Sequence, residues 1–220
     1  MARLARVVIP GVPHHVIQRG NRRQRTFWKD GDYREYLRLM AAFCKAEKVQ
    51  VWSYCLMPNH VHLIAVPKKA ESFHRAIGEA HRRYTRFINF QKKWRGYLWQ
   101  GRFSSYPLDD PHLYEAGRYV ENNPVVAKLV KVAWCYRWSS ARAPIEGEDD
   151  ELVRVSGLLS RVEDWKSYLQ EGVEKKFVRA FERHERTGRP LGDLRFLRRL
   201  ERTTGRALVP KSPGRPRKRK

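Results

Sequence analysis

Two neighbouring runs of apolar residues mark a pair of β-strands in the first third of the chain. Residues 49–56 and 60–66 are rich in β-branched, aromatic and other apolar side chains, and a short connection containing Pro58 and Asn59 separates them. Runs of this kind, joined by a tight turn, are typical of an antiparallel β-hairpin. The pattern therefore predicts two paired strands that are joined at Pro58 and Asn59.

The second of these strands carries two histidines, His60 and His62, with Val61 between them. Successive side chains of a strand point to opposite faces, so both imidazoles are expected on one face and Val61 on the other. Their Cβ atoms would then be roughly 6.5–7 Å apart, which lets both rings approach one cation. The pair predicts two ligands of a metal site whose third ligand comes from elsewhere in the chain.

The remaining periodicities of the first 145 residues predict a mixed fold. Period-two runs indicate further strands at 14–19 and 102–108. Apolar stripes at helical spacing indicate helices at 30–48, 72–92 and 110–123. The order strand, helix, strand, strand, helix, strand, helix predicts an α+β domain, with an antiparallel sheet of four to five strands and helices packed on it, of ferredoxin-like type.

Polar residues and prolines suggest where these helices begin and end. We expect Asp30 or Asp32 to cap the first helix. Asp110 is the predicted N-cap of the third helix, with Pro111 at the first helical position, where its missing N–H is not needed. Pro124 is expected to end or kink that helix.

Composition changes after residue 145. Five of the six residues 146–151 are acidic, which predicts an exposed linker. Beyond it, helices are expected at 162–168, 173–184 and 193–202, with Gly188 and Gly205 as C-terminal stops for the last two. The predicted division is a domain at 1–145, an acidic linker at 146–151, a helical accessory region at 152–208 and a disordered basic tail at 209–220.

Charge narrows the class of partner. Lys and Arg total 46 against 23 Asp and Glu, giving a formal net charge of +23. A two-to-one excess of cations predicts a polyanionic partner such as nucleic acid. The chain has no run of eighteen apolar residues, so we expect no membrane span, and three cysteines without a CxxC motif favour a cytoplasmic protein.

Several basic and polar side chains are candidates for DNA contacts, and a solvated surface charge is the alternative for each. The candidates are Arg19, Asn21, Arg22, Arg23, Arg82, Arg83 and Arg102. The tandem His14 and His15 face opposite ways in a strand, so they are a poor chelating pair and are expected to be structural or DNA-facing.

The third predicted helix adds a second chemical group. Tyr119 and Asn123 are four residues apart and therefore share one helical face. Tyr119 offers a nucleophilic phenol, and Asn123 offers a carbonyl oxygen to a metal. Glu121 and Asn122 are alternative third ligands, although Glu121 lies on another face of the helix. Tyr114 is the alternative tyrosine, but no ligand-type residue lies four positions after it.

Taken together, the ordered motifs give the chain a family resemblance. It resembles the HUH single-tyrosine transposases, which are IS200-like, and within them the REP-associated tyrosine transposases of bacteria. The matching segments cover about residues 7–145 and are 8–16 (VIPGVPHHV), 18–21 (QRGN), 57–63 (MPNHVHL), 98–103 (LWQGRF), 118–125 (RYVENNPV) and 138–141 (WSSA).

The resemblance implies an HUH nuclease fold and a specific chemistry. His60 and His62 would match the two metal-ligand histidines, Asn123 the third ligand and Tyr119 the nucleophile. The implied cofactor is a divalent metal, Mg2+ or Mn2+. The implied substrate is single-stranded DNA with a REP-like hairpin, cut through a 5′-phosphotyrosine intermediate. A monomer is expected, with a dimer left open, acting at the bacterial nucleoid in the cytoplasm.

Two other functions are compatible with the residues. The first is a non-catalytic protein that binds structured nucleic acid through its sheet and basic tail. The second is a metallohydrolase that uses a bound water and forms no covalent adduct with DNA.

Overall fold

The alternating segments fold into one antiparallel sheet. The computed structural model describes residues 6–160 and 162–210. Four strands pair in the order β2-β3-β1-β4. They are β1 (His14–Arg19), β2 (Val49–Met57), β3 (His60–Pro67) and β4 (Ser104–Pro107). The predicted α+β class and the hairpin of β2 and β3 are confirmed.

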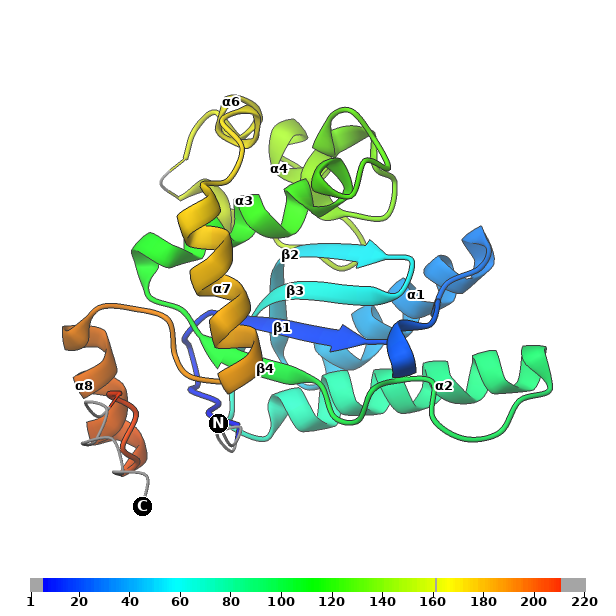
Figure 1. The fold of residues 1–220 in the computed structure, drawn as a ribbon, viewed down its shortest axis with the longest axis horizontal. Helices are drawn as coiled ribbons and strands as arrows, with labels where there is room; N and C mark the ends of the chain where they lie inside the picture. Colours follow the sequence, from blue (N-terminus) through cyan, green and yellow to red (C-terminus); the bar gives the residue numbers. More distant parts are fainter. Residues whose placement is uncertain (1–5, 161, 211–220) are drawn as a thin grey trace, which may run out of the picture.

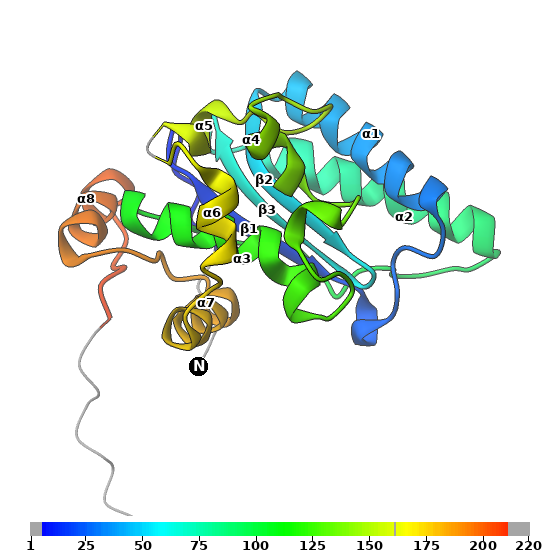
Figure 2. The same cartoon turned by 90° about the horizontal axis from the view of Figure 1, so that it is seen from above.

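Helices cover both faces of this sheet (Figure 1 and Figure 2). Helices α1 (Asp30–Ala46) and α2 (Glu79–Lys92) lie on one face, and α2 is preceded by a π-helical turn at His74–Gly78. Helix α3 (Asp110–Val126) lies on the other face. The smaller elements, which connect and cover the larger ones, are 3-10 turns at Asn21–Arg23, Ala133–Cys135 and Ser140–Arg142 and helices α4 (Ala143–Glu146), α5 (Ser156–Leu159), α6 (Trp165–Gln170), α7 (Lys175–Thr187) and α8 (Leu194–Thr204).

The alternation in β3 assigns its side chains to two separate cores. Val61 and Leu63 are fully buried in the cluster formed with α1 and α2. Ile64 is fully buried in the opposite cluster, with α3 and the C-terminal helices. His62 has the same parity as Ile64, so it faces α3. The face predicted for the histidines therefore carries the helix with Tyr119.

Two predicted helix ends need correction. The N-cap of α3 is Asp109, whose carboxylate accepts from the backbone N–H of His112, so Asp110 occupies the first helical position and Pro111 the second. In α1, Asp32 accepts from the backbone N–H groups of Trp28 and Lys29, from inside the first turn rather than from the cap position. In both helices an aspartate accepts from free backbone N–H groups at the start of the helix, but in α3 it is the residue before the predicted cap, and in α1 it is the third residue of the helix, with Lys29 at the cap position.

Pro124 neither ends nor breaks α3, which runs on to Val126. A proline at this position leaves the carbonyl of Val120 without its helical donor. The Asn123 side-chain amide takes over part of this role, because Nδ2 donates to Val120 O at 3.5 Å and to Tyr119 O at 2.9 Å. The continuation of the helix is thus tied to the orientation of Asn123.

The acidic segment is fixed against the sheet. Asp150 accepts from the Tyr54 hydroxyl at 2.8 Å and from the backbone N–H of Leu152 at 2.7 Å. Val153 forms a parallel bridge with Val51 on the edge strand β2. The predicted domain division stays a prediction, but residues 150–153 make specific contacts rather than forming a free linker.

The C-terminal helices pack on α3 through a buried carboxylate. Glu121 is fully buried and accepts from Ser140 Oγ at 2.6 Å and from Trp165 Nε1 at 2.7 Å. Burial raises the pKa of Glu121 to about 7. The predicted helix stops at Gly188 and Gly205 are confirmed, with φ of 69° and 65°. No helix in the described ranges is long and apolar enough to cross a membrane, and the tail from residue 211 onward lies outside them.

We predict that Glu121→Ala lowers the free energy of unfolding by about 2–4 kcal/mol, because two buried donors lose their acceptor. The measurement is the urea midpoint. The control is Glu146→Ala, which removes only an exposed ion pair with Arg142 and should change stability by about 0.5 kcal/mol or less. Equal midpoints for both variants would contradict the structural role of Glu121.

Candidate active site

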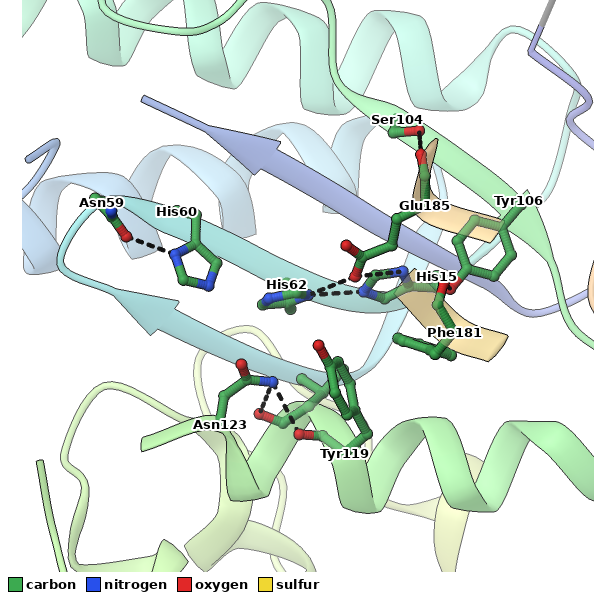
Figure 3. A network of polar contacts seen from close by, with 11 residues as sticks. His15, Asn59, His60, His62, Ser104, Tyr106, Tyr119, Asn123, Phe181 and Glu185 are labelled. Atoms are coloured by element: carbon green, nitrogen blue, oxygen red, sulfur yellow. Dashed lines mark hydrogen bonds and ion pairs between the residues drawn. The ribbon is translucent and has the colours of Figure 1, made fainter. Parts of the chain in front are cut away.

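Strand β3 brings its two histidines together on the face toward α3. The ring centroids of His60 and His62 are 4.9 Å apart, with the ring planes nearly perpendicular. His62 is 1% exposed and His60 is half-buried. Figure 3 shows both rings beside Tyr119 and Asn123.

The orientation of the His60 ring is set by its sequence neighbour. Asn59 Nδ2 donates to Arg23 O at 3.1 Å, so Asn59 Oδ1 is the acceptor of that side chain. His60 Nδ1 lies 2.6 Å from this oxygen and therefore donates to it. The unprotonated nitrogen of neutral His60 is then Nε2, which Figure 3 shows on the side toward His62.

His62 has its partner on the neighbouring strand. Its Nδ1 shares a hydrogen bond of 2.8 Å with Nε2 of His15 on β1. The other nitrogen of His62, Nε2, remains on the side toward His60. The two imidazoles thus have their Nδ1 atoms engaged by outer partners and their Nε2 atoms available.

Burial keeps both histidines neutral. It lowers the pKa of His60 to about 3, with a smaller contribution from the Arg19 cation. It lowers the pKa of His62 well below its usual value, with His60 and His15 adding to the effect. Neutral imidazole is the form that binds a metal ion.

Helix α3 places Tyr119 and Asn123 against this pair, as their spacing predicts. The Tyr119 ring centroid is 5.8 Å from that of His62, and Figure 3 shows its hydroxyl directed toward β3. The Asn123 amide nitrogen is engaged by backbone carbonyls, and the figure shows its oxygen on the side of the histidines. Two neutral imidazole nitrogens and one amide oxygen could hold a divalent cation such as Mg2+ or Mn2+.

The Tyr119 phenol is held as a neutral group. Burial raises its pKa above the usual value, the Glu185 and Glu182 carboxylates raise it further, and Arg19 lowers it. Its ring packs against Phe181 of α7 at a centroid distance of 4.6 Å. A cationic partner at the phenol oxygen would favour the phenolate that a nucleophile needs.

The alternative residues on α3 face away from the histidines. Glu121 binds Ser140 and Trp165, and Asn122 donates to Leu169 O at 3.0 Å. The Tyr114 hydroxyl lies 3.1 Å from Ser160 Oγ. All three side chains therefore contact the C-terminal half of the chain rather than the histidine pair.

The structure adds two side chains that the sequence reasoning did not assign to the site. His15 was expected to be either structural or DNA-facing. It is fully buried, which agrees with a structural role and not with a contact to DNA. Glu185 of α7 has one carboxylate oxygen 3.8 Å from His62 Nδ1 and 4.0 Å from His15 Nδ1. Together they form a His-His-Glu group that could hold a metal ion. Alternation in β1 placed His15 on one face, but no local signal pointed to Glu185.

Five of the predicted DNA contacts gather at the end of β1. Arg19, Arg23 and Arg102 line one groove, which also reaches Glu185. The segment before β4 packs against this end of β1. Gln100 N donates to Arg19 O, and Asn21 N donates to Leu98 O. Arg22 is exposed between these residues. The arginines outnumber the two glutamates, Glu182 and Glu185, that also line the groove, and such a cationic groove suits a phosphate backbone.

The other two predicted contacts, Arg82 and Arg83, lie on α2 and both pair with Glu79. Arg82 lines a second groove together with Arg102 and the exposed Tyr97. Arg102 therefore belongs to both grooves. All seven DNA contacts stay predictions.

Known proteins provide an independent comparison. Residues 10–123 match the family described as "Transposase IS200 like". No curated protein sequence matches the chain. Among solved structures, a REP-associated tyrosine transposase bound to a REP hairpin is similar, with a TM-score of 0.57 and 19% identity over 70% of this chain and 93% of that chain. A protein from Deinococcus radiodurans R1, assigned as a transposase, has a TM-score of 0.37 and 18% identity over 55% of this chain and 97% of that chain.

We predict that saturating Mn2+ stabilises the protein. At a concentration about 100 times the Kd, binding adds about 2.7 kcal/mol, which is about 5–10 °C in Tm for a chain of this size. His60→Ala should lose this shift because it removes one of two nitrogen ligands, whereas His74→Ala, at an exposed histidine, should keep it. A full shift in His60→Ala would exclude His60 as a ligand.

Proposed function

Because the chain belongs to the family of IS200-like transposases, we propose that it cuts and rejoins single-stranded DNA through a covalent tyrosine intermediate. In this proposal Tyr119 is the nucleophile, and His60, His62 and Asn123 hold a divalent metal, Mg2+ or Mn2+. The protein acts as an endonuclease and strand transferase, and its substrate is DNA with a REP-like hairpin. We place the reaction at the nucleoid, in the bacterial cytoplasm.

The observation that carries the proposal is the position of the Tyr119 phenol. It lies beside the His60 and His62 pair, and Asn123 follows one helical turn later. The four side chains come from β3 and α3 of the same chain. This arrangement supports a protein that acts as a monomer, without a tyrosine supplied by a second copy.

The first step forms the covalent intermediate. The Tyr119 oxygen attacks the phosphorus of the scissile phosphodiester, and the bond between phosphorus and the 3′ oxygen of the preceding nucleotide breaks. The phenol releases its proton to solvent, and the leaving 3′ oxygen takes up a proton from solvent. The products are a 5′-phosphotyrosine at Tyr119 and a free 3′-OH.

The second step rejoins the DNA by the reverse chemistry. A 3′-OH attacks the phosphotyrosine, a phosphodiester forms, and Tyr119 regains its proton. One ester bond replaces another in both steps, so the reaction consumes no nucleotide cofactor. The bound divalent ion would supply positive charge to the phosphate oxygens as charge develops on them.

The grooves beside the site provide the contacts for DNA. Arg19, Arg23 and Arg102 would bind phosphates that flank the scissile bond. The hairpin as substrate is supported by the similar solved structure, which is a REP-associated tyrosine transposase bound to a REP hairpin. The net charge of +23 agrees with a polyanionic substrate.

We predict that Tyr119→Phe forms no covalent adduct with a hairpin oligonucleotide in the presence of Mn2+, while its DNA affinity stays within about threefold, because the hydroxyl is needed for attack rather than for docking. The adduct is measured as a shifted band on a denaturing protein gel. Tyr114→Phe is the matched control and should form the adduct at the wild-type level.

Other outcomes of this experiment identify the alternatives. An adduct that persists in Tyr119→Phe would remove Tyr119 from the proposed role. Cleavage without any adduct in the wild type would indicate a metallohydrolase. Binding without cleavage of any hairpin tested would indicate a non-catalytic nucleic-acid binder.

We predict that Arg102→Ala weakens binding of the hairpin oligonucleotide and reduces the salt dependence of affinity by about one unit of log–log slope, because one phosphate contact is lost. Affinity is measured by fluorescence anisotropy at several salt concentrations. Arg38→Ala is the control, since Arg38 lies on α1 and pairs with Glu35. Equal salt slopes in all three proteins would contradict the phosphate contact.

A further inference from the structure

The two histidines of β3 are held in the same way at their outer nitrogens. His60 Nδ1 donates to Asn59 Oδ1, and His62 Nδ1 shares a hydrogen bond with His15 Nε2. Asn59 can only accept at that oxygen, so the proton position on His60 is fixed by the structure. For His62, which ring donates this hydrogen bond depends on the partner of the other His15 nitrogen, Nδ1.

Beside the two rings, two buried polar atoms have no hydrogen-bond partner among the residues that the structure describes. They are His15 Nδ1 and Glu185 Oε1. The two atoms are 4.0 Å apart, about 1 Å longer than a hydrogen bond between a ring nitrogen and a carboxylate. Glu185 Oε1 also lies 3.8 Å from His62 Nδ1, but that nitrogen already has a partner in His15 Nε2 at 2.8 Å, so His15 Nδ1 is the nitrogen left for the carboxylate. One is a ring nitrogen that can carry a proton and the other is an acceptor, so a small rotation of the Glu185 side chain would satisfy both.

We propose that Glu185 and His15 are positioning residues for His62, joined by hydrogen bonds from His62 Nδ1–H to His15 Nε2 and from His15 Nδ1–H to the Glu185 carboxylate. The inference rests on the proposed role of His62 as a metal ligand. In this order each ring carries one proton, and the only lone pair left on His62 is at Nε2, the nitrogen on the side of His60. A hydrogen-bond acceptor at the outer nitrogen of a histidine ligand also makes that ligand a stronger donor, and here the acceptor is His15 Nε2.

Hydrogen bonds from β4 fix helix α7 at a position where Glu185 lies close to His15. Ser104 Oγ donates to Glu185 O at 3.2 Å, and the Tyr106 hydroxyl donates to Phe181 O at 3.4 Å, so two side chains of β4 hold the helix backbone. The Phe181 ring contacts His15 at a centroid distance of 4.5 Å. The helix lies beyond residues 10–123, so this chain adds to the site from outside the segment that matches the family.

The alternative is direct coordination, in which His15, His62 and Glu185 hold the cation themselves. Such a site would use Nδ1 of His62 rather than Nε2, and it would leave His60 and Asn123 out. The position of the proton on His62 therefore separates the two arrangements. The charge on Glu185 separates them as well, since a ligating carboxylate needs its charge more than a hydrogen-bond acceptor does.

The first test reads the proton directly. Long-range 1H–15N spectra of the full chain labelled at histidine, without added metal, should show His62 protonated at Nδ1. His15→Phe keeps an aromatic ring beside Phe181 but removes the acceptor, and it should shift His62 toward protonation at Nε2. Protonation of His62 at Nε2 in the wild type would overturn the proposal.

The second test measures Mn2+ affinity of the full chain by calorimetry. Glu185→Leu removes the acceptor and should weaken Mn2+ binding about 10–100-fold. Glu185→Gln keeps an acceptor oxygen without the charge and should show a smaller loss. Glu182→Gln removes a charge from the same helix, at an exposed position, and should bind within about twofold of wild type. Urea midpoints identify any variant that fails to fold.

The outcomes separate this inference from the proposed function. Wild-type affinity in Glu185→Leu, or a loss in Glu185→Gln as large as in Glu185→Leu, would overturn the inference while the proposed function stands. Absence of Mn2+ binding in the wild type would contradict the proposed function itself, and the proton position on His62 would still decide the order of the hydrogen bonds.

Discussion

The register between β1 and β3 is the constraint on which the site depends. Ile17 pairs with His62 and His15 pairs with Ile64, so His15 and His62 are diagonal neighbours on one face of the sheet. A slip of one residue would turn one of these imidazoles to the opposite face, among the apolar side chains packed under α1 and α2. The hydrophobic pattern that fixes the register therefore also brings the two rings within hydrogen-bond distance.

Burial explains why these histidines need outer partners. An imidazole in an apolar layer stays neutral, but it still has one donor and one acceptor nitrogen to satisfy. Asn59 and His15 each engage one nitrogen, which leaves the second nitrogen of each ring facing the same region near Tyr119 and Asn123. The same desolvation that lowers their pKa values keeps both rings neutral, in the form that the proposed metal site requires.

The C-terminal helices also contact the elements that carry the candidate active site. Glu121 binds Trp165 through a buried hydrogen bond, which couples α3 to α6. The Phe181 ring contacts both His15 and Tyr119, which couples α7 to the sheet and to α3. A region that the sequence marks only as helical and charged thus contributes one wall of the candidate active site.

The sequence alone determined what depends on local periodicity. Alternation placed His60 and His62 on one face, and helical spacing placed Tyr119 and Asn123 together, because both depend only on backbone geometry along a few residues. Pro124 misled the prediction of the helix end, since the compensating hydrogen bonds come from the Asn123 side chain. Tertiary structure alone decided that Glu185 lies beside His15. The two are 170 positions apart, no periodicity joins such distant segments, and only the packing of α7 on β4 and β1 brings them together.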